Sequence, residues 1–154
     1  MTTLTGPRPT AQAREYGDRI AQVLVVAFAL SAAHTGYGYF AGIGDASFTL
    51  TTPVAYVFYA VGFTSAALAR RTERWAQVTL LAYLTVLLAM AVFYYPTTFM
   101  PRQQTTFGWF ENDVYTGLLM VAAYLAVLRI RGCVLRPSDA NLTRGISARD
   151  QADR

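Results

Sequence analysis

The sequence predicts an all-α polytopic membrane protein, a bundle of four transmembrane helices with both termini in the cytoplasm. Three observations lead to this prediction. Hydrophobic residues make up 54% of the 154 residues and charged residues only 14%, whereas about one quarter of a soluble domain is charged. The apolar residues gather into four long runs, and the basic residues gather in the segments before, between and after these runs.

Each apolar run approaches the roughly 20 residues that a helix needs to cross a hydrocarbon core of about 30 Å. The runs are continuous rather than alternating, which favours helices over barrel strands. Pro96 is predicted to end the third span, because proline removes a backbone hydrogen bond from a helix. Arg129, at the inner end of the fourth span, is placed to extend its side chain toward lipid head groups. The predicted spans cover residues 20–40, 50–69, 75–95 and 114–130.

The positions of the basic residues predict the orientation. All thirteen are Arg, and twelve of them lie in segments 1–19, 70–74 and 129–154, which four crossings place on one side of the membrane. Arg102 is the one that falls on the other side. Because basic residues concentrate in cytoplasmic segments, both termini are predicted to lie inside the cell.

The predicted organisation is a cytoplasmic segment, 1–19, a transmembrane domain, 20–130, and a polar cytoplasmic tail, 131–154. A competing interpretation is a cleavable signal peptide, because an Arg-bearing start, an apolar stretch and the small residues 31–33 follow one another. Cleavage there leaves three spans. The run stays mostly apolar beyond residue 33, and Glu15 and Asp18 dilute the basic segment, so the intact four-span arrangement is favoured.

The long connection 96–113 is predicted to be an outer loop. Connections of this length often carry function, which favours an interaction surface. The alternative is an amphipathic segment that lies on the bilayer, with Asn112 or Asp113 capping the fourth helix. The candidate contact residues in this loop are Arg102, Trp109, Glu111 and Asp113.

His34 is the only histidine and lies in the outer half of the first span. Polar residues in a bilayer normally face the interior of a bundle or a cavity. His34 is therefore a candidate ligand-binding residue, and the alternative is a single hydrogen bond between helices. No predicted span holds Asp or Glu in its interior, which argues against an ion-coupled pump or carrier. Hydroxyls predicted to converge on His34 come from Tyr56, Tyr59, Tyr83 and Tyr124.

No catalytic residue and no metal site is predicted, and the chain is more readily understood as a protein that is not an enzyme. A single Cys, Cys133, and a single His exclude the usual zinc patterns, and no phosphate loop or Ser/His/Asp triad is present. Acids in the tail offset its Arg residues, so no nucleic-acid partner is expected. Small residues four apart favour close contacts between helices of the same chain over dimerisation: Gly38 and Gly42, Gly62 and Ala66, Ser65 and Ala69.

Several short stretches resemble DoxX-type small membrane proteins. They are residues 33–39 (Ala-His-Thr-Gly-Tyr-Gly-Tyr), Phe48, Thr52-Pro53 and residues 59–62 (Tyr-Ala-Val-Gly). The resemblance spans roughly residues 14–130 and implies a bacterial inner-membrane subunit, in some cases linked to quinone-coupled oxidation of sulfur compounds or thiols. Phe63 stands where such proteins often carry an acidic residue, so no catalytic residue is transferred. Another small actinobacterial membrane family fits the same features.

The leading hypothesis is a non-catalytic accessory or structural subunit that needs no cofactor. It contacts the lipid bilayer and a larger membrane complex, or a second copy of itself, through its helix faces and segment 96–113. One alternative is a DoxX-like redox subunit with a quinone or lipid pocket near His34. Another is a small-molecule carrier that acts as a dimer.

Overall fold

The computed structural model describes residues 11–98 and 105–134, and the regular structure in these residues is entirely helical. The prediction of an all-α chain is confirmed for this part. Three helices are long and apolar enough to cross a membrane, and a fourth, shorter helix is also apolar. The elements are α1 (Ala11–Phe40), α2 (Pro53–Ala69), α3 (Arg74–Ala89), the π-helical turn η1 (Met90–Tyr94), α4 (Tyr95–Thr98) and α5 (Thr106–Val134).

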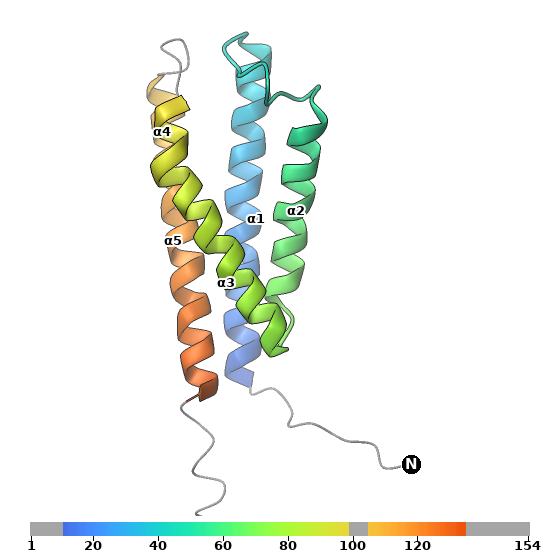
Figure 1. Ribbon diagram of the computed structural model, residues 1–154, viewed down its shortest axis with the longest axis vertical. Helices are drawn as coiled ribbons and strands as arrows, with labels where there is room; N and C mark the ends of the chain where they lie inside the picture. The colour runs from blue at the N-terminus through green and yellow to red at the C-terminus, as the bar shows by residue number, and fades with distance from the viewer. Residues whose placement is uncertain (1–10, 99–104, 135–154) are drawn as a thin grey trace, which may run out of the picture.

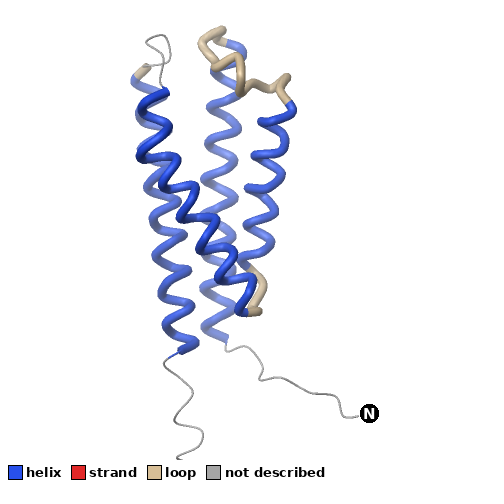
Figure 2. The backbone as a smooth tube through the Cα atoms, in the orientation of Figure 1, coloured by secondary structure: helices blue, strands red, loops and turns tan. Residues whose placement is uncertain are grey.

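The helices lie side by side, and α3 crosses the others obliquely (Figure 1). α1 contacts both α2 and α5, while α3 contacts α5 and α2. Helix α1 begins and helix α5 ends at the same end of the structure, which we call the termini end. At the opposite end, the distal end, α1 is joined to α2 by a loop and turns (Figure 2).

The core combines large side chains of α1, α3 and α5 with small residues of α2. The buried residues of α2 include Gly62, Ser65, Ala66 and Ala69. A Cβ atom on Gly62 would lie 2.5 Å from the ring of Phe28, so a larger residue does not fit there. The predicted small-residue spacing of α2 thus serves contacts within the chain. The largest fully buried side chains are Phe28, Ile20, Leu24, Leu80, Leu84 and Leu119.

The Gly38 and Gly42 pair, in contrast, does not bring two helices together. Gly42 lies beyond the end of α1 with a φ of 67°, the left-handed conformation in which glycine commonly terminates a helix. The amides of Ile43 and Gly44 both donate to the carbonyl oxygen of Gly38, at 3.0 and 2.9 Å. These glycines therefore fold the loop back onto the end of α1.

Two helices begin earlier than predicted. α1 begins at Ala11, so part of the predicted segment 1–19 is helical. α5 begins at Thr106, so residues 106–113 are helical rather than part of a loop. The hydroxyl of Thr105 accepts a hydrogen bond from the amide of Gly108, at 3.0 Å, and so satisfies one of the free amides at the start of α5.

Pro96 does not end the third predicted span, and that prediction is wrong. The helical path runs from α3 through the π-helical turn and continues as α4 to Thr98. Proline lacks an amide and clashes with the preceding turn of a regular α-helix. Local π-helical geometry is one way in which membrane helices accommodate proline, and here the turn lies directly before Tyr95 and Pro96.

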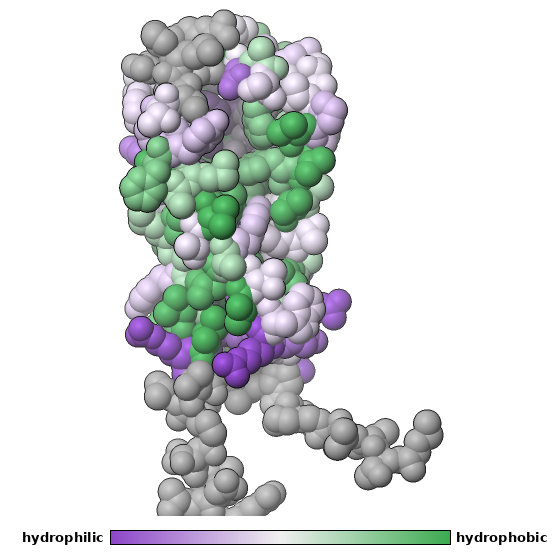
Figure 3. Space-filling view, in the orientation of Figure 1, coloured by the Kyte–Doolittle hydropathy of each residue, from purple (hydrophilic) through white to green (hydrophobic). Residues whose placement is uncertain are grey.

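Large apolar side chains point outward from every long helix. Figure 3 shows a hydrophobic zone across the middle of the visible face, with hydrophilic residues at the termini end. Water-soluble proteins rarely expose contiguous apolar surface of this extent. Together with the three long apolar helices, this surface indicates a membrane protein. Examples of exposed residues are Val26, Val57, Val86, Val121, Phe40 and Phe93.

Candidate functional site

Polar side chains gather inside the distal half of the structure, between α1, α2 and α5. We call this group the distal polar cluster: His34 and Thr35 of α1, Tyr59 of α2, and Glu111 and Tyr115 of α5. Helical residues four apart share a face, which places Glu111 and Tyr115 on the same side of α5. The cluster thus depends on α5 beginning at Thr106, because only then is Glu111 part of a helix.

Glu111 is the acid of the distal polar cluster. The residue is 4% exposed, and its Oε2 atom lies 4.0 Å from Nδ1 of His34. This distance exceeds that of a hydrogen bond, so the two groups interact through charge when His34 is protonated. The carboxyl group is also within electrostatic reach of the hydroxyls of Tyr59, Tyr95 and Tyr115. Glu111 thus belongs to α5, a helix long and apolar enough to cross a membrane, whereas the sequence places it in a loop before the fourth span.

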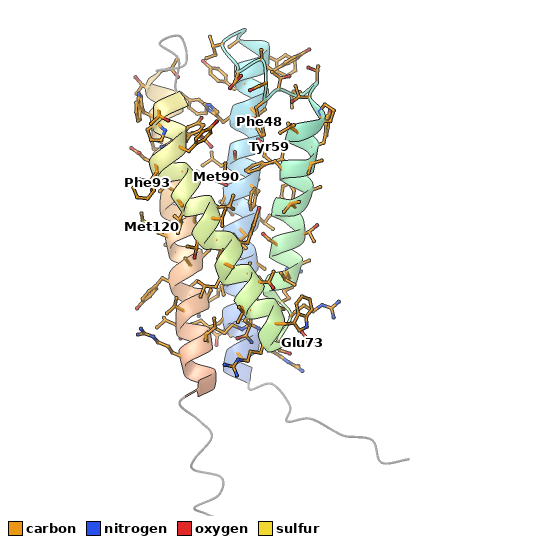
Figure 4. All side chains as sticks on the ribbon, viewed as in Figure 1. Phe48, Tyr59, Glu73, Met90, Phe93 and Met120 are labelled. Carbon is orange, nitrogen blue, oxygen red and sulfur yellow. The ribbon has the colours of Figure 1, made fainter. Side chains whose placement is uncertain are left out.

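Tyr59 ties α2 to α1. Its hydroxyl donates to the carbonyl oxygen of Ser31 at 3.0 Å and lies 2.6 Å from the hydroxyl of Thr35. Figure 4 labels Tyr59 next to Phe48, whose ring centroid is 6.0 Å from that of Tyr59. Because the Tyr59 hydroxyl has partners on α1, this side of the cluster fixes the position of α2.

Other polar atoms in this region lack such partners. Within the described residues, Nδ1 of His34, the hydroxyl of Tyr115 and the hydroxyl of Thr116 are buried without a hydrogen-bond partner. Buried polar groups in native proteins are nearly always satisfied, and each exception calls for an explanation. Two of these atoms, Nδ1 of His34 and the hydroxyl of Tyr115, lie near Glu111.

His34 lies between Glu111 and the surface of the protein. Its ring stacks on Phe107 with a centroid separation of 5.6 Å, and Phe107 contacts Tyr37 edge to face at 5.1 Å. Phe107 and Tyr37 are both exposed. The side chain of His34 is 21% exposed and that of Glu111 is 5% exposed, so the imidazole is the more accessible member of the pair.

The structure brings only some of the predicted ligand residues together. His34 and Tyr59 belong to the distal polar cluster, and Tyr83 is half-buried within electrostatic reach of Tyr115. Tyr56 and Tyr124 are 64% and 63% exposed, and the Tyr56 hydroxyl donates to the backbone of the preceding loop. The predicted convergence of these two tyrosines on His34 does not occur.

The predicted contact residues of segment 96–113 are also separated. Glu111 faces the interior, while Trp109 and Asp113 lie on the exposed side of α5. Arg102 lies outside the described residues. The helical start of α5 is the physical reason, because it turns neighbouring residues to different faces, whereas a loop allows them to share one surface.

Arg129 forms a second buried polar site, at the termini end. It is 3% exposed, so the prediction that it extends toward lipid head groups is wrong. Its guanidinium donates to the carbonyl oxygen of Ala69 at 2.6 Å and to that of Arg71 at 2.9 Å. The absence of a side chain at Gly17 of α1 leaves room for this hydrogen bond, since a Cβ atom there would lie 2.8 Å from the Ala69 oxygen. Arg129 thus satisfies carbonyl groups at the end of α2.

Comparison with known proteins returned no match: no family model, no curated protein and no solved structure matches this chain. The resemblance to DoxX-type proteins therefore remains a prediction from short sequence stretches. Among the side chains that the structure describes, no group of three or more His, Cys, Asp or Glu is placed to hold a metal ion. The distal polar cluster is the candidate site that the geometry supplies.

Proposed function

We propose that this chain is a four-span protein of the bacterial inner membrane, in which the shorter helix α2 crosses the bilayer together with the three longer helices. The exposed faces of α2 support this, because Val54, Val57 and Val61 are exposed and apolar. A helix of 17 residues rises about 26 Å at 1.5 Å per residue. This is slightly less than a hydrocarbon core of about 30 Å, and the bilayer thins locally around short spans.

The orientation with both termini in the cytoplasm is supported by the arginines. Within the described residues, the distal end carries no Arg, whereas several Arg side chains lie at the termini end. Figure 3 shows the strongly hydrophilic residues of the visible face gathered at this end. Arginine concentrates on the cytoplasmic side of membrane proteins. The exposed arginines at the termini end are Arg14, Arg19, Arg70, Arg71, Arg74 and Arg131.

Cysteine labelling with a membrane-impermeant reagent tests this orientation. Ala46 is exposed in the distal loop, and replacing it leaves intact the hydrogen bonds from Ser47 to Asp45. In a Cys133→Ser background, we expect Ala46→Cys to be labelled in intact cells. In the wild-type protein, we expect Cys133 to be labelled only after the cells are lysed. Labelling of Cys133 from outside would reverse the proposed orientation.

The function that the geometry supports best is the binding of a small lipid-soluble molecule at the distal polar cluster. The observation that carries this proposal is the buried Glu111 near two buried polar atoms without partners, Nδ1 of His34 and the hydroxyl of Tyr115. Ionisable groups inside a membrane are costly and usually belong to functional sites. A quinone suits these groups, because its carbonyl oxygens accept hydrogen bonds from the imidazole of His34 and the hydroxyl of Tyr115, and a quinol hydroxyl donates to Glu111.

In this proposal the chain is an accessory subunit that positions the molecule for a partner in the same membrane. Bound quinone is measured by solvent extraction of protein purified in native lipids, followed by chromatography. We expect near-equal amounts of quinone and protein, and loss of most of the quinone in Glu111→Gln. Asp113→Asn, two residues further along α5 and exposed, is the matched control and should retain it. Equal, low amounts in all three proteins would exclude the quinone.

A small-molecule carrier is the second candidate. The absence of a membrane carboxylate was the sequence argument against it, and the burial of Glu111 removes that argument. A carrier releases its ligand on both sides of the membrane. Uptake into vesicles that contain the purified protein therefore separates a carrier from an accessory subunit, which only binds.

A further inference from the structure

We propose that His34 and Glu111 form a proton-binding site that exchanges protons with the aqueous phase at the distal end. The inference rests on the proposed placement of α1 and α5 in the membrane, but it does not depend on the quinone. The two groups lie on different helices, with Nδ1 of His34 and Oε2 of Glu111 separated by 4.0 Å. Among the described residues, the buried Nδ1 atom of His34 has no hydrogen-bond partner, and Glu111 is 4% exposed.

The charges around Glu111 explain why a proton is held there. The titratable groups that face it are His34 of α1, Tyr59 of α2, Tyr95 of α4 and Tyr115 of α5. Among these groups only His34 can supply a positive charge near neutral pH. Burying a carboxylate without a partner is energetically unfavourable, so the pair is best accommodated with one proton, carried by either the imidazole or the carboxyl group.

The arrangement also defines the direction of exchange. The imidazole is the more exposed group and contacts the exposed ring of Phe107, whereas the buried Nδ1 atom is directed toward Glu111. A proton from the aqueous side binds at Nε2 of an imidazole that carries its hydrogen on Nδ1. The resulting imidazolium passes the Nδ1 proton to Oε2 of Glu111 and remains neutral with its hydrogen on Nε2. The two atoms approach to about 2.8 Å for this transfer.

Infrared difference spectroscopy of the full chain in quinone-free phosphatidylcholine nanodiscs tests this site. Spectra at about pH 5 and about pH 9 bracket the ordinary titration range of histidine. We expect the carbonyl band of a protonated carboxyl group that titrates with pH, disappears in Glu111→Gln and persists in Asp113→Asn. A titrating band that persists in Glu111→Gln would overturn the assignment to Glu111, and so would the complete absence of such a band.

The role of His34 is measured by the rate at which the band responds to a pH jump. We expect His34→Gln to keep the band but slow the response about 100-fold, the lower limit for a positioned proton-transfer group. An unchanged rate would exclude His34 as the relay. If Glu111→Gln does not fold, wild-type protein with ¹³C-labelled glutamate decides the assignment. The carbonyl band of a buried glutamic acid must then shift, and Glu111 is buried whereas Glu15 and Glu73 are exposed. Since the lipid contains no quinone, these results are independent of the proposed ligand.

Discussion

The two ends of the protein treat buried polar groups in opposite ways. At the termini end, Arg129 donates to two carbonyl oxygens at 2.6 and 2.9 Å. At the distal end, His34 and Glu111 remain 4.0 Å apart, and the Tyr115 hydroxyl is buried without a partner. A buried polar group with partners holds elements together, whereas one without partners lowers stability unless a ligand or proton uses it. The comparison contrasts a structural site with the candidate functional site.

The largest effect is expected at the structural site. Arg129→Leu leaves the carbonyl oxygens of Ala69 and Arg71 without these donors, and a hydrogen bond to a charged group contributes about 1.5 to 3 kcal/mol. We expect the free energy of unfolding in detergent to fall by about 3 kcal/mol. Arg131→Leu is the control, because Arg131 is exposed on the same helix. Equal losses in the two variants would show that Arg129 is not a structural site.

A smaller effect is expected from the glycines of α1. In Gly17→Ala the new Cβ atom meets the backbone oxygen of Ala69 at 2.8 Å, and such overpacking costs about 1 to 3 kcal/mol. Gly36 lies in the distal half, and a Cβ atom there meets nothing within 4 Å. Gly36→Ala should therefore leave stability unchanged or raise it slightly. Thermal unfolding of both variants measures the contrast, and equal destabilisation would mean that the two ends are equally tightly packed.

The smallest effect is expected at Thr35 and Tyr59, two members of the distal polar cluster that are hydrogen-bonded to each other. Thr35→Val removes the hydrogen bond to Tyr59, and such bonds between membrane helices contribute about 0.6 kcal/mol on average. Thr64→Val is the control, because the hydroxyl of Thr64 donates to Ala60 of its own helix and is exposed. The two stabilities are compared by unfolding in denaturing detergent. A loss in Thr35→Val as large as that in Arg129→Leu would make the distal end structural too.

The helices were predictable because long apolar runs in this sequence leave few other structures possible. The faces of those helices were less predictable, because lipid and protein interior are both apolar and the pattern barely distinguishes them. Tyr56 and Tyr59 illustrate this: they lie one turn apart on α2, yet one is exposed and the other is half-buried and bonded to α1.

From the sequence, Glu111 is predicted to lie in a loop, because it precedes the apolar run and adjoins Asn112 and Asp113. A usable signal was nevertheless present. The inward positions of α5 recur every three or four residues, so following this stripe in both directions from its apolar centre reaches Glu111 and Arg129. The stripe consists of Glu111, Tyr115, Leu119, Ala122, Ala126 and Arg129. Pro96, in contrast, carried no signal that its helix continues, because the π-helical turn that accommodates it forms only in the folded chain.

The π-helical turn Met90–Tyr94 determines which side chain beyond it is directed toward Glu111. A π-helical turn holds one residue more than an α-helical turn, and one residue corresponds to about 100° of rotation around a helix axis. In the observed phase Tyr94 is 60% exposed, while Tyr95 is less exposed and lies within electrostatic reach of Glu111. Tightening the turn into a regular α-helix would rotate Tyr94 toward the interior in place of Tyr95. The extra residue of the π-helical turn therefore decides which of two adjacent tyrosines lies near Glu111.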